Sequence, residues 1–295
     1  MKLEIISKRT IRINICLFVI LFSPAAGLFL STPAFSQTPL LLGVHPFLPV
    51  AVIEQKFTPL VNYLIRKVGR PIVLRVGSSF GEHIDAIGRD QLDIAYISPV
   101  AYVEMVEKYG RKPLLACLEN EGSPFFTGII FVRSEIKTES LADLPTGDLA
   151  FVDSHSTMGY LLPRIMILNA KPMLITGHHY QFLRTHENVV LGVLSGDFVA
   201  GAVKNAIYQK FKNRGLKALA VTPPVAEHLL LTRSNLDQEL IESLRAALLS
   251  LKSLPAEKAV LTTLKPSLTG FSPVKDADYD SLRKLITASK TRGGK

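Results

Sequence analysis

The sequence predicts an α/β protein of two lobes, each built on a mostly parallel sheet, with two hinge crossings and a cleft between the lobes. Strand and helix patterns alternate along most of the chain, which is typical of parallel sheets covered by helices. The alternation restarts after a polar stretch near residues 119–127, and a second break follows at Thr222-Pro223-Pro224. Two such breaks indicate that the chain crosses twice between the lobes. A ligand cleft is then expected where the carboxyl ends of the strands meet.

The first series of elements runs from residue 40 to residue 118. Apolar residues at helical spacing over Ala51–Val68 predict an amphipathic helix. Ser79 with Glu82 forms a capping-box pattern at the start of the next helix, and a proline opens the third. The expected elements are a strand at Leu40–Val44, a helix at Ala51–Val68, a strand at Pro71–Val76, a helix from Phe80, a strand at Asp93–Ile97, a helix at Pro99–Tyr109 and a strand at Pro113–Leu118.

The second series contains a strand that leads directly into the polar run 153–157 and then into a helix. The expected elements are strands at Gly128–Arg133 and Leu149–Val152, a helix at Asn188–Leu194, strands at Phe198–Val203, Lys217–Val221 and Leu229–Thr232, and a helix at Leu236–Lys252. Lobe one is therefore expected to comprise residues 38–124 and 230–295, and lobe two residues 125–229.

The first 36 residues are expected to be a signal peptide rather than part of the fold. Four basic residues precede the apolar run Ile13–Phe22, and Ala34-Phe35-Ser36 offers small residues for cleavage. The uninterrupted apolar run is too short to span a bilayer comfortably. A retained N-terminal anchor is the alternative, if the apolar stretch to Leu30 counts as one segment. We expect export to the periplasm with cleavage near Ser36-Gln37.

Charge and cysteine content exclude several classes of protein. The formal net charge of +9 falls to +6 without the leader, which carries four Lys or Arg and one Glu. No basic stripe with interleaved aromatic residues is present, so a nucleic-acid partner is not expected. A mildly basic chain is compatible with an anionic ligand. Cys16 leaves with the leader, so Cys117 is alone in the mature chain and no disulfide framework is expected.

Catalytic and metal motifs are weak in this sequence. Gly77-Ser78-Ser79-Phe80-Gly81 matches the nucleophile elbow of serine hydrolases, with His186 or His228 as nominal partners, but no His-Gly-Gly precedes it. A secreted hydrolase using Ser79 is therefore a distant alternative to a capped helix start. His178 and His179 would point to opposite faces of an extended segment. We expect no metal site, no cofactor and no catalysis.

Polar and aromatic groups stand at the turns where the predicted strands lead into helices. A cleft would meet its ligand there, because free amides, hydroxyls and the helix dipole converge on a bound oxyanion. Any single one of them is better explained as a helix cap or a satisfied surface group, whereas six such turns around one cleft favour a binding site. The candidates are His45, Phe80, Ser98 and Tyr102 in lobe one, and Ser156, Thr157, His186 and Asn205 in lobe two.

At these residues the chain resembles the periplasmic substrate-binding proteins of phosphonate, phosphite and phosphate ABC importers, which have the type II periplasmic binding protein fold. The resemblance is carried by FVDSHSTMGYLLP (151–163), RTHENVVLGVLSGDFVAGAVKNAIY (184–208), LDIAYISPVAYV (92–103) and GIIFVRSEI (128–136). It implies that Ser156 and Thr157 hold the phosphonate oxygens, and that His186 and the groups from Ser98 to Tyr102 face the ligand. It further implies a monomer that delivers a small anionic solute to an inner-membrane ABC permease.

Three residues depart from the family pattern. Met158 replaces the third hydroxyl of the Ser-Thr-Ser run, Phe80 stands at a tyrosine position, and Asn205 replaces an acidic residue suited to an aminoalkyl phosphonate. The alternative function is a sensor of the same fold that signals to a membrane histidine kinase. Some family members with a functional cysteine sense arsenite, so Cys117 is a candidate ligand for that soft species. Burial as a small hydrophobe is the other interpretation of Cys117.

Overall fold

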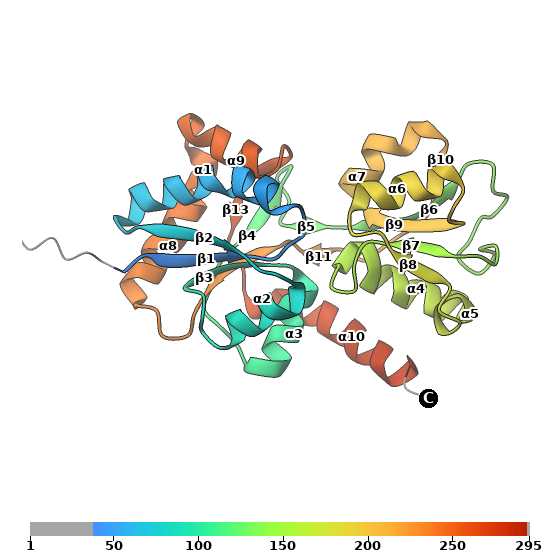
Figure 1. Ribbon diagram of the computed structural model, residues 1–295, viewed down its shortest axis with the longest axis horizontal. Helices are drawn as coiled ribbons and strands as arrows, with labels where there is room; N and C mark the ends of the chain where they lie inside the picture. Colours follow the sequence, from blue (N-terminus) through green and yellow to red (C-terminus); the bar gives the residue numbers. More distant parts are fainter. Residues whose placement is uncertain (1–37, 294–295) are drawn as a thin grey trace, which may run out of the picture. The chain divides into compact units, whose positions relative to one another are not determined.

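One sheet has six strands in the order β13-β4-β12-β3-β1-β2 (Figure 1). The computed structural model describes residues 38–293, and their side chains as far as residue 288, so the expected signal peptide lies outside the described residues. The strands are β1 (Leu40–Val44), β2 (Ile72–Val76), β3 (Ile94–Ile97), β4 (Leu114–Asn120), β12 (Leu229–Thr232) and β13 (Leu268–Ser272). Strands β2, β1 and β3 are parallel, whereas β12 is antiparallel to β3 and β4, and β13 is antiparallel to β4.

A second sheet has five strands in the order β10-β6-β9-β7-β8. They are β6 (Gly128–Arg133), β7 (Leu149–Phe151), β8 (Tyr180–Phe182), β9 (Ala200–Lys204) and β10 (Leu216–Val221). Strands β9, β7 and β8 are parallel, and β6 runs against both β9 and β10. Most strands of each sheet thus share one direction. The strands that oppose it are β6 in the five-stranded sheet and β12 and β13 in the six-stranded sheet, and β6 and β12 are the strands that follow the polar breaks.

The helices cover both faces of the six-stranded sheet. Successive side chains of a strand point to opposite faces, and β1 shows this directly: Leu40, Leu42 and Val44 lie in the apolar core beneath α1, α8 and α9, whereas Leu41 packs on the side of α2 and α3. The helices of this part are α1 (Val50–Val68), α2 (Phe80–Gly88), α3 (Pro99–Tyr109), α8 (Gln238–Ser250), α9 (Lys258–Leu264) and α10 (Asp280–Gly293).

The five-stranded sheet carries its own helices, of which α6 (His186–Ser195) begins with a hydroxyl cap. The other helices of this part are α4 (Leu162–Ala170), α5 (Met173–Thr176) and α7 (Asn205–Phe211), and a π-helical turn, Thr157–Leu161, precedes α4. The helix expected at Asn188–Leu194 begins two residues earlier, because the hydroxyl of Thr185 accepts a hydrogen bond from the amide of Asn188 at 3.1 Å and so caps it.

Two short strands join the sheets. β5 (Phe125–Phe126) and β11 (Val225–Ala226) pair with each other in antiparallel register, and both lie between the two sheets in Figure 1. Beside them, the amide of Gly128 donates to the hydroxyl of Thr222 at 2.8 Å. The chain thus passes between the two sheets near residues 119–127 and again after Thr222-Pro223-Pro224, and the two passages are joined by backbone hydrogen bonds.

The packing of this core can be tested at Phe57 on α1. Its side chain is 1% exposed, and its ring packs against that of Tyr96 in an edge-to-face arrangement with the ring centroids 5.1 Å apart. We expect Phe57→Ala to lower the free energy of unfolding by about 3–5 kcal/mol, because it leaves a cavity in the core. Val50→Ala, at a side chain that is 52% exposed at the start of the same helix, is expected to change it by less than about 0.5 kcal/mol. Equal effects in urea unfolding would contradict the assigned core.

Candidate ligand-binding site

The polar run after β7 folds into a tight turn that Gly159 makes possible. The hydroxyl of Ser156 accepts a hydrogen bond from the amide of Gly159 at 3.1 Å, and the amide of Val152 donates to the Gly159 carbonyl at 3.0 Å. A Cβ atom at Gly159 would lie 2.4 Å from a methyl group of Val152 and 2.7 Å from the Ser156 hydroxyl. Only glycine allows this close approach, which fixes the position of Thr157.

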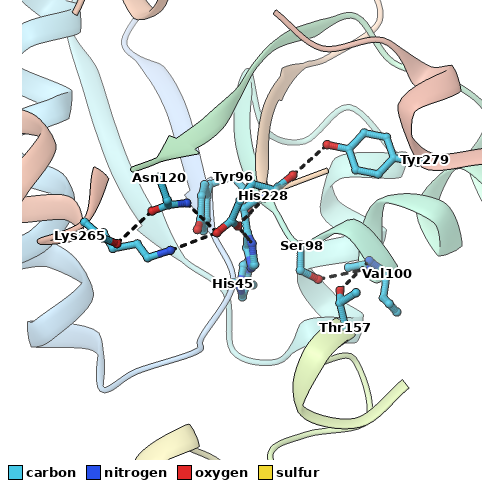
Figure 2. A network of polar contacts seen from close by, with 12 residues as sticks. His45, Tyr96, Ser98, Val100, Asn120, Thr157, His228, Lys265 and Tyr279 are labelled. Carbon is cyan, nitrogen blue, oxygen red and sulfur yellow. Dashed lines mark hydrogen bonds and ion pairs between the residues drawn. The ribbon is translucent and has the colours of Figure 1, made fainter. Parts of the chain in front are cut away.

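Thr157 contacts the start of α3, which belongs with the other sheet. The amide of Val100 donates to the Thr157 hydroxyl at 3.2 Å (Figure 2). The Ser98 hydroxyl donates to the carbonyl of His155 at 3.4 Å. Ser98 also caps α3 by accepting from the amide of Ala101. Thr157 and Ser98 are only 2% and 3% exposed. We call Ser98, Val100, His155 and Thr157 the α3–turn contact.

A row of aromatic rings adjoins the α3–turn contact. His45 stacks on Tyr96 with ring centroids 5.3 Å apart, and Tyr96 stacks on His228 at 5.4 Å. On its other side, His45 lies 4.8 Å from Phe80, whose ring is parallel to that of His155 at 5.4 Å. The rings of Phe80, His45, Tyr96 and His228, which we call the ring row, therefore reach the turn that carries Ser156 and Thr157.

The buried imidazoles of this region are held neutral. Burial lowers the pKa of His45 well below its ordinary value and lowers the pKa of His83 to about 4. Both rings approach the carbonyl of Tyr96, His83 at 3.0 Å and His45 at 3.3 Å, so each is placed to donate a hydrogen bond to it. Burial and the nearby charge of Lys204 also lower the pKa of His228 to about 4, against the effect of Glu227.

Glu227 is a buried carboxylate directly after β11. It is 1% exposed, and its oxygens accept hydrogen bonds from Asn120 at 2.8 Å, from the amide and ring of His228 at 3.0 and 2.8 Å, and from Lys265 at 3.1 Å (Figure 2). Burial favours the protonated acid, but the His228 hydrogen bond and the charges of Lys265 and Lys204 hold the pKa of Glu227 well below its usual range. The carboxylate therefore stays ionised and ties the second crossing to the six-stranded part.

His186 and Lys204 come from the five-stranded part. The amide of Lys204, at the end of β9, donates to Nδ1 of His186 at 3.3 Å. The Lys204 ammonium lies 5.5 Å from the centre of the Phe126 ring, which in turn meets His228 at 5.7 Å. Burial lowers the pKa of Lys204 to about 8 and that of His186 well below its usual value. A cation and an imidazole of this part thus lie beside the ring row.

Of the residues that the sequence nominated, the structure brings His45, Phe80, Ser98, Thr157 and His186 into this region, with Ser156 capping its turn. It adds Tyr96, Glu227, His228, Lys204, Lys265 and Asn120. The sequence could have pointed to Glu227 and His228, because an acidic residue and a histidine stand side by side there between the second break and an apolar strand.

Four nominated residues have other contacts. Tyr102 is fully buried, and its hydroxyl donates to Asp276 at 2.7 Å. Asn205 lies at the start of α7 and accepts from Gln209. Cys117 is 1% exposed in the apolar core, where burial raises the pKa of its thiol to about 12 and so disfavours the thiolate that would bind arsenite. Ser79 caps α2 through the amide of Glu82, and no histidine among the described side chains bonds to it.

The fold is that of the type II periplasmic binding proteins. The model of a family described as "ABC transporter, phosphonate, periplasmic substrate-binding protein" matches residues 42–279, so the chain belongs to this family.

Individual relatives are distant in sequence. The phosphate-import protein PhnD of Mycolicibacterium smegmatis is 23% identical over 265 residues, which cover 81% of this chain and 82% of that protein. The phosphonates-binding periplasmic protein of Escherichia coli is 21% identical over 258 residues, 82% of this chain and 74% of that protein. PhnD1 of Prochlorococcus marinus, solved in complex with methylphosphonate, has a TM-score of 0.72 at 16% identity, covering 85% of this chain and 98% of that one.

The contribution of the hydrogen bonds around Glu227 can be tested by measuring the free energy of unfolding. We expect Glu227→Gln to lower the free energy of unfolding by about 3–5 kcal/mol, because it leaves the Lys265 ammonium without its buried counter-charge. Glu139→Gln is the matched control: that side chain is 91% exposed and its contact with Lys217 is a surface ion pair, worth about 0–1 kcal/mol. A loss at Glu227 no larger than at Glu139, measured by urea unfolding at pH 7, would contradict a buried network.

The neutral imidazoles predict a pH dependence. The pKa of His83 is about 4 in the folded chain and about 6.5 in the unfolded chain, so the unfolded state binds more protons between these values. Stability is therefore lost as the pH falls from about 6.5 to about 4. His83→Gln should flatten this part of the profile, measured by thermal melts across the range. His179→Gln, at a side chain that is 44% exposed, is the control and should leave the slope unchanged.

Proposed function

We propose that the chain captures a small oxyanion of the phosphonate, phosphite or phosphate class for an inner-membrane ABC importer. The observation that carries the proposal is the α3–turn contact, in which the amide of Val100 and the hydroxyl of Thr157 meet at 3.2 Å. An amide at a helix start and a hydroxyl are both suited to oxyanions, because the helix dipole favours negative charge there. A ligand oxygen between them would exchange this one hydrogen bond for one from each group.

Capture requires that the two sides of the site separate. We propose that the six-stranded and five-stranded parts are the two lobes, residues 38–124 with 230–295 and residues 125–229, and that the paired crossings β5 and β11 form the hinge. Val100 belongs to the first lobe and Thr157 to the second, so a ligand bound by both favours the closed form. Closure of two domains around a ligand by bending at a few residues is a common mechanism.

The family places such proteins in the periplasm, and we propose that this chain is exported, cleaved near Ser36-Gln37 and monomeric. Its leader pattern of basic, apolar and small residues supports export. Among residues 38–293, no helix has the length and apolar character needed to cross a membrane.

The ligand is tested by thermal melting of residues 37–295 with phosphate, phosphite, methylphosphonate and sulfate. A ligand at 100 times its dissociation constant should stabilise the chain by about 2.7 kcal/mol. Thr157→Val should weaken binding about tenfold or more, because it removes a hydrogen bond to a charged group. Thr58→Val, at an exposed threonine of α1 whose hydroxyl bonds only to Glu54, is the control and should bind normally. If no oxyanion shifts the melt, the proposal is wrong.

The importer role has its own test. A strain that lacks this chain should lose uptake of the identified ligand at low concentration and regain it with the wild-type gene. Normal uptake with a lost transcriptional response to the ligand would instead assign the chain to a sensor that signals to a histidine kinase.

A further inference from the structure

Lys204 is a cation without a counter-charge of its own. Among the described residues, no hydrogen bond or ion pair joins its ammonium group to another residue. The ammonium lies over the face of Phe126, 5.5 Å from the centre of the ring. The other lysine beside this region, Lys265, is bonded to Glu227 at 3.1 Å.

The groups around Lys204 do not compensate its charge. His45, His186 and His228 are held neutral by burial, and the positive charge of Lys204 contributes to lowering the pKa of each. Glu227 is the carboxylate within electrostatic range, but it already accepts four hydrogen bonds, from Asn120, Lys265 and His228. The charge of Glu187 also raises the pKa of Lys204, but less than the charge of Glu227 does. The positive charge of Lys204 beside the ring row is therefore not neutralised by these neighbours.

Lys204 is half-buried, and an unpaired cation that is partly withdrawn from water is costly unless a partner of opposite charge binds it. Lys204 ends β9, and its amide bonds to His186, so the backbone that carries it is fixed. Its position differs from that of the α3–turn contact. The ammonium lies over the ring of Phe126, which in turn meets His228, whereas the α3–turn contact is joined to the ring row through Phe80 and His155. The site thus offers a second point of attraction for negative charge.

We propose that Lys204 selects ligands that carry a second negative group beyond the phosphonate, such as a carboxyalkyl phosphonate, and disfavours those that carry an ammonium group. The inference rests on the proposed function, since it assumes that the phosphonate itself binds at the α3–turn contact. Asn205, the next residue, is uncharged, so nothing at this position attracts an amine.

The experiment compares two ligands of similar length, phosphonoacetate and 2-aminoethylphosphonate, by calorimetry on residues 37–295. Methylphosphonate, which has no second group, is the reference. The wild-type chain should bind phosphonoacetate at least about tenfold more tightly than 2-aminoethylphosphonate, because only the former places a carboxylate near the ammonium. Lys204→Met should remove this preference. Lys204→Glu should reverse it.

Lys210→Met is the matched control, since it removes an exposed lysine of the adjoining helix α7 and should preserve the wild-type ratio. Equal affinities of the wild-type chain for the two ligands, or a ratio unchanged by Lys204→Met, would overturn the role of Lys204 while methylphosphonate binding upholds the proposed function. Binding of none of the three would overturn both. If Lys204→Met does not fold, Lys204→Gln and the wild-type ratio decide the question.

Discussion

The buried carboxylate of Glu227 is the interaction on which the arrangement of the site depends. It directly follows the second crossing. It accepts hydrogen bonds from Asn120 at the end of β4, from Lys265 just after α9 and from the ring of His228. Its own carbonyl accepts a hydrogen bond from Tyr279 at 2.9 Å. Because a buried charge is tolerated only when it is fully paired, these segments are held in one geometry. The ring row and the start of β12 are positioned by that geometry.

The site combines groups of two kinds. At the α3–turn contact, neutral donors and a helix start offer hydrogen bonds to an oxyanion, whereas around the ring row the imidazoles are kept uncharged by burial. Neutral rings add surface for a ligand without adding charge, so the electrostatic character of this region is set by Glu227, Lys265 and Lys204. Because Glu227 and Lys265 are paired with each other, the charge of Lys204 makes this region positive.

Much of this architecture could be predicted from the sequence, because the strands and helices carry strong periodic patterns and polar caps. The helix at Pro99–Tyr109 and the strand at Gly128–Arg133 have the expected bounds. Ser98 and Thr157 were found because hydroxyls at helix starts have a known physical role. Lys265 was missed, since its partner Glu227 lies 38 residues away and pairing across such a distance leaves no local pattern. Tyr102 was misplaced for the same reason: Asp276 lies 174 residues away.

The placement of Cys117 has a consequence for the association of the chain. Its sulfur lies in β4 between β12 and β13, within 3.7 Å of the Ser272 carbonyl and nearly inaccessible to solvent. Two copies of the folded chain cannot bring their thiols together without opening that sheet, and a protonated thiol is a poor nucleophile. Oxidising surroundings therefore leave the folded chain without a route to a covalent dimer through Cys117, and any dimer linked at that residue marks molecules that have unfolded.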